Sequence, residues 1–326
     1  MIVAITGGTG FIGQRLALRH LSLGDEVRVL SRHVPESLLL QHPVKWWQGD
    51  LSNNLDITGF VDEVDVLYHC AGEIYDVSKM QQLNVEGTSR LIAAASKKIS
   101  RWVQLSSVGA YGQKHTGLVT EETKPDPGGV YESTKLDSDK LIINAADSGA
   151  FEHVILRPSN VYGAGMRNQS LYRLISMINR GVFLSVGKKD SSANYIHVEN
   201  VVDALILCGT KPAARGQTYN LSDYRTLEDF VGAIAQALDK SYLTIRIPEY
   251  AARFAVKVIS RLPGISITES SISALTNRIK YACNKIESEL SYKHVISMEQ
   301  GLDELIRYWK SSRITPDSNN NLSINP

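Results

Sequence analysis

A tyrosine and a lysine four residues apart are the side chains of this sequence best suited to acid–base chemistry. Tyr131 and Lys135 begin a segment whose pattern predicts a helix, so both side chains share one helical face. A phenol with its ordinary pKa of about 10 supplies little base at neutral pH. A nearby ammonium favours the phenolate and lowers that pKa. The pair therefore predicts proton transfer; the alternative interpretation is an ordinary surface pair.

A serine pair lies upstream of the tyrosine, at the end of a predicted strand. Ser106 closes the apolar segment Trp102–Ser106, and Ser107 follows it. Ligands of parallel sheets bind beyond the carboxyl ends of the strands, so a hydroxyl here can hydrogen-bond the carbonyl or alcohol oxygen of a substrate. The alternative is a turn serine that caps its own backbone.

The N-terminal segment predicts a dinucleotide site. A short apolar strand runs into a glycine turn, and a helix pattern follows. Gly8, Gly10 and Gly13 fit G-x-G-x-x-G, and Gly7, Gly10 and Gly13 also fit G-x-x-G-x-x-G. Glycines let a pyrophosphate approach the backbone, and the helix N-terminus offers it free N–H groups. The strand before the turn and the helix after it are the context that this motif requires.

The end of the second predicted strand bears on which nicotinamide cofactor is bound. NAD enzymes usually place an acidic residue here to bond the ribose 2′-hydroxyl. This chain has Ser31 followed by Arg32. The missing carboxylate removes repulsion toward a 2′-phosphate, and a guanidinium can pair with that phosphate, so we expect NADP(H) in preference to NAD(H). The alternative is that Arg32 is a solvated surface arginine.

Alternating strands and helices predict an α/β fold, a Rossmann-type doubly wound parallel sheet with a smaller C-terminal α/β substrate-binding lobe. We expect a dinucleotide-binding domain over 1–158, a substrate lobe with elements returning to the first domain over 159–310, and a disordered polar tail over 311–326. The predicted strands of the first half are Ile2–Thr6, Glu26–Leu30, Val44–Gln48, Val66–Cys70, Trp102–Ser106 and His153–Arg157, and its clearest helices are Phe11–Leu23, Lys79–Lys97 and Tyr131–Asp147.

Composition excludes several classes of protein. The 326 residues carry 35 basic and 34 acidic side chains, so charge gives no argument for a nucleic-acid partner. Cys70, Cys208 and Cys283 are far apart and match no disulfide framework or zinc site. No apolar run is long enough to span a bilayer, and no signal peptide is evident. We expect a cytoplasmic protein without a bound metal.

Taken together, these motifs make the chain resemble the extended short-chain dehydrogenases/reductases over about residues 1–310. That branch contains nucleotide-sugar epimerases and dehydratases, dihydroflavonol reductases and 3β-hydroxysteroid dehydrogenases. The resemblance rests on motifs in the family's order: the glycine turn, Gly49–Leu51, His69–Gly72, Asn84–Thr88, Ser106–Ser107, Tyr131 with Lys135, Leu156–Gly163 and Tyr195–Val198.

The resemblance implies roles for individual residues. Tyr131 would be the general acid/base, Lys135 would lower its pKa and hold the nicotinamide ribose, and Ser107 would orient the reacting oxygen. It also implies a homodimer formed through the helices predicted at Lys79–Lys97 and Tyr131–Asp147. The residues expected at the cofactor are Gly7, Gly10, Phe11, Ile12, Gly13, Ser31, Arg32, Asp50, Leu51, Ala71, Gly72, Ser106, Tyr131, Lys135 and Pro158, and those expected at the substrate are Ser107, Tyr131 and Asn160.

Three functions remain open. The first is an NAD(P)-dependent epimerase or reductase that acts on a secondary alcohol or ketone of a nucleotide-activated sugar. The second is an NADPH-dependent reductase of a non-nucleotide ketone, of the dihydroflavonol or steroid type. The third is a nonenzymatic dinucleotide-sensing protein on the same fold, disfavoured because Ser107, Tyr131 and Lys135 are all present.

One position departs from the nucleotide-sugar pattern. Relatives of that kind often carry an arginine two positions before the Tyr-Ile-His-Val segment, where it pairs with the diphosphate. Here the residue is Ala193, which weakens the nucleotide-sugar interpretation. Another cation could substitute, and the sequence alone places none of the candidates, which are Arg167, Arg180, Lys188, Lys189 and Arg278.

Overall fold

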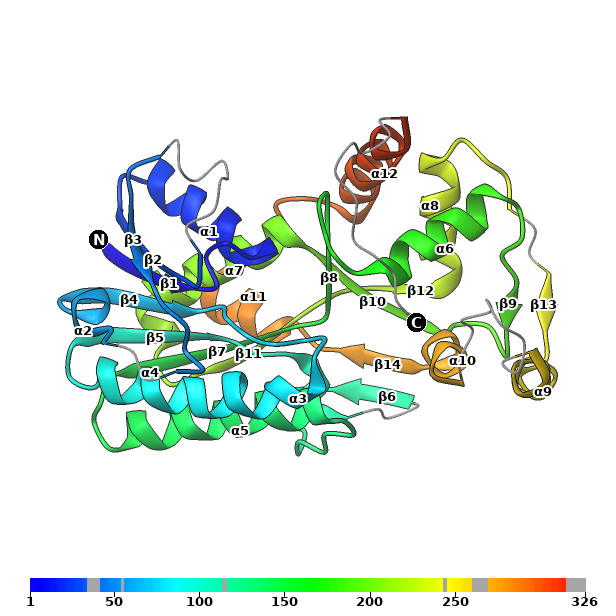
Figure 1. Cartoon of the computed structure of the whole chain (residues 1–326). Helices are drawn as coiled ribbons and strands as arrows, with labels where there is room; N and C mark the ends of the chain where they lie inside the picture. The colour runs from blue at the N-terminus through cyan, green and yellow to red at the C-terminus, as the bar shows by residue number, and fades with distance from the viewer. Residues whose placement is uncertain (34–41, 54–55, 113–115, 243–244, 260–268, 315–326) are drawn as a thin grey trace.

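A seven-stranded parallel sheet organises the first half of the chain in the computed structural model, which describes residues 1–33, 42–53, 56–112, 116–242, 245–259 and 269–314. The strand order β11-β7-β5-β4-β1-β2-β3 confirms the predicted doubly wound sheet (Figure 1). The strands are β1 (Ile2–Thr6), β2 (Glu26–Ser31), β3 (Val44–Gln48), β4 (Val64–His69), β5 (Ile99–Leu105), β7 (Glu152–Pro158) and β11 (Thr218–Leu221).

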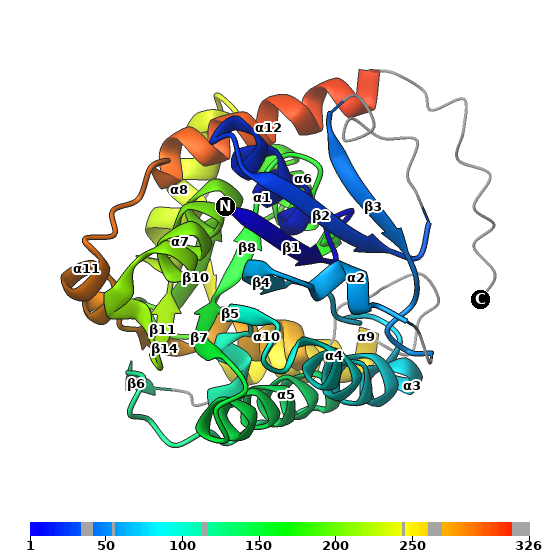
Figure 2. The same cartoon turned by 90° about the vertical axis from the view of Figure 1, so that its left-hand side faces the viewer.

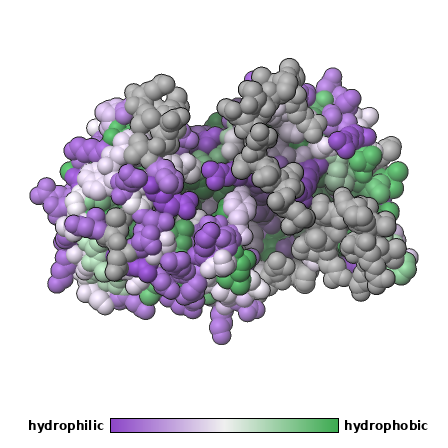
Figure 3. All heavy atoms as spheres, viewed as in Figure 1, coloured by the Kyte–Doolittle hydropathy of each residue, from purple (hydrophilic) through white to green (hydrophobic). Residues whose placement is uncertain are grey.

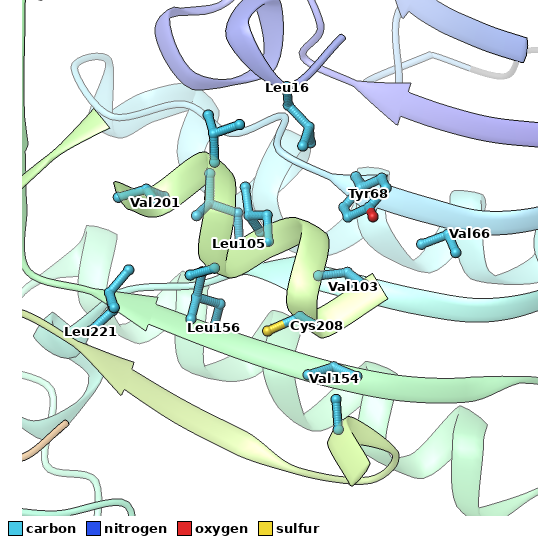
Figure 4. Close-up of a cluster of buried hydrophobic side chains, with 14 of the residues drawn as sticks. Leu16, Val66, Tyr68, Val103, Leu105, Val154, Leu156, Val201, Cys208 and Leu221 are labelled. Atoms are coloured by element: carbon cyan, nitrogen blue, oxygen red, sulfur yellow. The ribbon is translucent and has the colours of Figure 1, made fainter. Parts of the chain in front are cut away.

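Helices cover both faces of this sheet because its strands are apolar on both sides. Side chains alternate along β4, so Val66 and Tyr68 enter one core cluster while Leu67 enters the other. The first cluster lies under α1 (Phe11–Ser22) and α7 (Val198–Thr210), where Figure 4 shows Leu16 and Val201 facing the strands. The opposite face carries α2 (Thr58–Val61), α4 (Thr88–Ala95) and α5 (Val130–Asp147) (Figure 2).

The second half of the chain builds a separate apolar core and returns some elements to the first. β8 (Asn160–Tyr162), β10 (Ser192–His197) and β12 (Asp223–Thr226) form a three-stranded sheet. β11 joins the large sheet, beside β7. The remaining elements are β6 (Thr116–Val119), α6 (Gln169–Asn179), β9 (Ser185–Val186), α8 (Leu227–Ala237), β13 (Arg246–Ile247), α9 (Glu249–Ile259), α10 (Glu269–Thr276), β14 (Arg278–Tyr281), α11 (Asn284–Leu290) and α12 (Met298–Ile314).

The helix predicted over Lys79–Lys97 is found as one continuous helical stretch from Val77 to Ala95, but its middle part is a π-helix. α3 (Val77–Met80) leads into a π-helix over Gln81–Gly87, and α4 follows. Within this stretch the Thr88 hydroxyl donates to the Asn84 carbonyl oxygen at 2.7 Å. π-Segments often occur at functional sites, where the widened turn re-aims a side chain. Here the widened turn carries Asn84, which is buried.

The C-terminal prediction needs a second correction. The tail expected to be disordered from Ser311 onward continues as helix to Ile314. Ile306 and Trp309 of α12 are buried in the core of the second lobe, which holds this helix in place. Residues 315–326 lie outside the described part of the chain.

Polar side chains make up much of the molecular face seen in Figure 3. Within the described ranges, no helix combines the length and apolar character that a membrane crossing requires.

Candidate active site

The glycine turn between β1 and α1 brings the backbone close to two neighbouring strands. Gly7 has φ +68°, and a Cβ there would lie 2.7 Å from the amide nitrogen of Ala71. A Cβ on Gly8 would lie 2.7 Å from Val29 of β2, and one on Gly13 would collide with the Gly7 carbonyl. At Gly7 and Gly13 any other residue would require the backbone to shift, and at Gly8 it would require the Val29 side chain to move. The turn is therefore a close-packed cradle with the N-terminus of α1 opening onto it.

A cavity of about 230 Å³ lies at the carboxyl ends of β1, β2 and β4, beside this turn. Its position matches the place where open α/β sheets bind dinucleotides. Eight residues expected at the cofactor line it: Gly7, Gly10, Ser31, Arg32, Asp50, Leu51, Ala71 and Gly72. Thr6, Thr9, Leu30, Gly49, Cys70, Leu83 and Arg167 complete the lining. Phe11, Ile12, Gly13, Ser106, Tyr131, Lys135 and Pro158, also expected at the cofactor, do not line this cavity.

Charges at the rim of the cavity fit a phosphorylated ligand. Arg32 is exposed there, and Ser31 donates its hydroxyl to the carbonyl of His33 at 2.7 Å. Partial burial raises the pKa of Asp50, but hydrogen bonds from Ser52 and the charge of Arg32 outweigh it, so the net pKa is lowered. The Asp50 carboxylate is thus ionised and already accepts from the Ser52 amide and hydroxyl, at 2.9 and 2.7 Å.

Arg167 is a cavity residue that the sequence alone could not place. It comes from the connection between β8 and α6, in the second half of the chain. Arg15 of α1 holds this connection by donating to the carbonyls of Phe11 at 2.9 Å and Ala164 at 2.6 Å. Of the five candidate cations named from the sequence, Arg167 lines the cavity and the other four do not. Only the folded backbone brings it there, since its spacing from the glycine turn carries no signal.

Ser107 and Tyr131 meet beyond the end of β5. Ser107 follows that strand, and its hydroxyl accepts from the Gly109 amide at 3.0 Å, which caps the 3-10 turn Val108–Tyr111. The capping alternative is therefore also realised. Burial raises the pKa of Tyr131 to about 12, Glu132 adds to this, and a hydrogen bond with Ser107 opposes it. The pKa lowering expected for this phenol is not found in the protein alone, because burial dominates.

Lys135 lies one turn along α5 from Tyr131 and is buried. Its ammonium donates to the carbonyl oxygen of Leu105, the last residue of β5, at 2.5 Å. Burial lowers the pKa of Lys135, while the charge of Asp139 and the thiol of Cys70 raise it. The net effect is a lowered pKa for Lys135, because burial outweighs these charges.

The other expected residues are distributed around this centre. The Ser106 hydroxyl is buried and donates to Asp139 at 2.7 Å, so it faces away from any ligand that fills the cavity. Asn160 is exposed at the start of β8 and donates to the Asn194 carbonyl at 3.1 Å. Pro158 ends β7. Ala193 is buried in the apolar core of the second lobe.

The side-chain amide of Asn84 forms hydrogen bonds with two segments of the site. Its oxygen accepts from the Glu73 amide at 2.7 Å, and its nitrogen donates to the Glu73 carbonyl and the Thr134 hydroxyl, both at 3.1 Å. These bonds connect the loop after β4 to α5. The arrangement favours a structural role for Asn84, because both N–H donors and the oxygen of its amide already have partners within the protein.

Comparison with known proteins gives one family model, described as the NAD dependent epimerase/dehydratase family, which matches residues 3–222. The dTDP-6-deoxy-L-talose 4-dehydrogenase (NAD(P)(+)) of Kitasatospora kifunensis is 30% identical, covering 65% of this chain and 71% of the relative. The 3 beta-hydroxysteroid dehydrogenase/Delta 5-->4-isomerase of Mycobacterium tuberculosis is 26% identical, covering 95% and 90%. Among solved structures, UDP-glucuronic acid 4-epimerase from Bacillus cereus in complex with NAD has a similar fold, with TM-score 0.76, 20% identity and coverage of 96% and 99%.

Proposed function

Because the chain belongs to the NAD dependent epimerase/dehydratase family, we propose that it moves a hydride to or from a secondary alcohol or ketone of a nucleotide-activated sugar, as an epimerase or a reductase. It is an NAD(P)-dependent enzyme of the extended short-chain dehydrogenase type. The observation that carries the proposal is that Tyr131 hydrogen-bonds Ser107 just beyond β5, while Lys135, one turn along α5, binds the last carbonyl of the same strand. The glycine-cradled cavity at the neighbouring strand ends supports it.

The residues present fit a dinucleotide, because Gly7 and Gly10 of the turn line the cavity at the strand ends together with Arg32. Bound there, the nicotinamide supplies or accepts the hydride. Gly7 and Gly10 would approach the phosphates of the dinucleotide, and Asp50 and Leu51 would lie at its adenine. During reduction of a carbonyl, Tyr131 gives its proton to the oxygen while Ser107 holds that oxygen. Lys135 stabilises the phenolate that remains.

For the cofactor, we propose NADP(H) in preference to NAD(H). Arg32 stands exposed at the cavity rim, beside Ser31 and with no acidic residue in the ribose position. We also assign Arg167 to the phosphates of the dinucleotide, since it lines the same cavity as the glycine turn. A guanidinium binds phosphate oxygens in pairs, so both assignments rest on the same chemistry.

A reductase of a non-nucleotide ketone is the second candidate, and a specific observation favours it. The position where nucleotide-sugar relatives often place an arginine is the buried Ala193. The similarity to a steroid dehydrogenase covers almost the whole chain, which also supports a reductase of a non-nucleotide ketone. The nucleotide-sugar proposal is supported by the dTDP-6-deoxy-L-talose 4-dehydrogenase, whose 30% identity exceeds the 26% of the steroid dehydrogenase.

Product analysis distinguishes the nucleotide-sugar enzyme from the reductase of a non-nucleotide ketone. The protein is incubated with a panel of nucleotide sugars and of non-nucleotide ketones, with NADPH, with NADH and without either. Mass spectrometry and NMR then identify an isomer of unchanged mass or a reduced product. Conversion of a nucleotide sugar supports the proposal. Conversion of other ketones alone moves the function to the second candidate.

The arrangement of chains is also a proposal. We propose that residues 1–158 bind the cofactor, that 159–310 supply the substrate lobe, and that two chains associate through the helices over Lys79–Lys97, which include α4, and Tyr131–Asp147, which lies within α5. These helices lie side by side on one face of the large sheet, so the same side of the molecule carries both (Figure 2). Sedimentation velocity measures the assembly, and a monomer at all concentrations would contradict it.

A further inference from the structure

Two side chains of α5 form hydrogen bonds with two consecutive residues, the last residue of β5 and the one after it. The ammonium of Lys135 donates to the Leu105 carbonyl at 2.5 Å. One turn further along, the Asp139 carboxylate accepts from the Ser106 hydroxyl at 2.7 Å. The next residue of the chain is Ser107. The end of the strand that presents Ser107 is therefore attached to the helix that presents Tyr131.

Asp139 is buried and forms an ion pair with Arg157 of β7; burial raises the pKa of its carboxyl, and Arg157, Lys135 and the Ser106 hydrogen bond oppose this. Asp139 and Arg157 are 1% and 6% exposed, and Arg157 Nη2 and Nε donate to Asp139 Oδ2 at 3.0 and 3.3 Å. Removing a charge from water costs free energy that only well-placed partners repay. Oδ2 accepts every one of these bonds, and Oδ1 has no hydrogen-bond partner among the described residues.

Arg157 connects Asp139 to the 3-10 turn that follows Ser107. Its guanidinium lies 4.9 Å from the centre of the Tyr111 ring, and the Tyr111 hydroxyl donates to Asn220 at 2.9 Å. Tyr111 ends the 3-10 turn that Ser107 caps. Asp139 thus contacts the residue before Ser107 directly, and it contacts the end of the turn after it through Arg157.

We propose that Asp139 is a positioning residue for the reaction, which fixes Ser107 and Lys135 relative to Tyr131 through Ser106 and Arg157. The proposal rests on the proposed function, because that function gives the three residues their chemical roles. Misplacing a reacting group by about 1 Å can cost about 100-fold in rate, so such an anchor has a large effect on turnover.

The same two strands offer a matched control. At their other ends, Arg101 of β5 faces Glu152 of β7, and the two side chains form an ion pair at 2.8 Å. Arg101 is also buried. Glu152→Gln therefore removes a carboxylate from a buried arginine on the same strands, far along them from Ser107. A purely structural role for Asp139 predicts that its loss lowers stability but leaves kcat of the folded protein near the wild-type value, as expected for Glu152→Gln.

The kinetic experiment compares Asp139→Asn, Ser106→Ala, their double variant and Glu152→Gln on the compound that the wild type converts. We expect kcat to fall at least about 10-fold in the first two, with the cofactor Kd within about 3-fold of wild type. The double variant should be no slower than the slower single variant, because both break one connection. Glu152→Gln should keep kcat. Additive losses, or an equal loss of kcat in Glu152→Gln, would overturn the proposal.

A second readout needs no activity. Amide hydrogen exchange of the peptide 105–112 should become faster in Asp139→Asn and Ser106→Ala, and should match wild type in Glu152→Gln. Unchanged exchange in the first two would overturn the proposal even if kcat fell. If the wild type converts nothing in the panel, the proposed function fails while exchange still decides the role of Asp139. If Asp139→Asn does not fold, Ser106→Ala decides.

Discussion

Lys135 donates its ammonium to the backbone carbonyl of Leu105 at 2.5 Å, which ties the helix that carries the phenol to the strand that leads into Ser107. The cation is thus held beside the site before any ligand arrives. Burial meanwhile raises the pKa of Tyr131 to about 12. The resting site therefore holds a protonated phenol, which is the form that reduction of a carbonyl consumes.

The direction of reaction should determine its pH dependence. Oxidation of an alcohol needs the phenolate, whose fraction rises with pH below the pKa of Tyr131, so kcat/KM for oxidation should increase from pH 7 to pH 10. Reduction needs the protonated phenol and should stay flat across the neutral range. Rate profiles in both directions check this. Tyr172→Phe, which removes another phenol whose pKa burial raises to about 12, is the control and should leave both profiles unchanged.

Arg32→Met should change which cofactor binds. Loss of the guanidinium removes a charge-assisted pair with a 2′-phosphate, so the Kd for NADPH should rise about 10-fold or more. NADH lacks that phosphate and serves as the internal control. Fluorescence titration of both cofactors measures the change. Equal weakening of the two would show that Arg32 does not read the 2′-phosphate.

Arg167→Met should weaken NADPH and NADH to a similar extent, because both carry the pyrophosphate beside the glycine turn. A several-fold increase in each Kd is expected for loss of one cation at an exposed site. Lys189→Met, which removes an exposed cation outside the cavity lining, is the control. Unaltered Kd values in Arg167→Met would remove this residue from the cofactor site.

Acid should destabilise the fold through His69. Its ring lies between the hydroxyls of Thr6 at 2.6 Å and Thr88 at 3.0 Å, and burial lowers its pKa to about 3. The Thr88 hydroxyl donates to Asn84, so it accepts from His69 Nε2, and Nδ1 accepts from Thr6. Protonation would disrupt this neutral arrangement.

The sign of the effect follows from linkage. Between an unfolded-state pKa of about 6.5 and the folded value, the unfolded chain binds more protons, so stability is lost as pH falls through this window. His69 should account for up to about 2 kcal/mol between pH 7 and pH 5. Urea unfolding at both pH values measures it. In His69→Gln the difference should shrink, while His20, His153 and His197, whose pKa values burial also lowers, leave a remainder. An undiminished difference in that variant would contradict the assignment.

Local patterns allowed the sequence to predict much of this molecule. The glycine turn, the strand ends and the Tyr131–Lys135 spacing are each contained within a few neighbouring residues, and the parallel topology follows from the order of strands and helices. The π-helix at Gln81–Gly87 was missed, because the apolar spacing of a continuous helix does not reveal a widened turn fixed by tertiary contacts.

Long-range contacts explain the other omissions. Asp139 and Arg157 each look like ordinary charged residues in the sequence, and only their burial against one another marks them as part of the site. Arg167 reaches the cavity because Arg15 holds the connection that carries it. Ser106 was expected at the cofactor, yet its hydroxyl points to Asp139, a distinction that two adjacent serines cannot reveal in sequence.

The most direct test of the account compares wild type with Tyr131→Phe on the compound selected by product analysis. Cofactor titration and turnover are measured on the same preparations. We predict that the Kd for NADPH stays within about 2-fold while kcat falls about 100-fold or more, because proton transfer is lost and the binding cavity is not. Retained turnover in Tyr131→Phe would contradict the account, since the phenol could then not be the acid of the reaction.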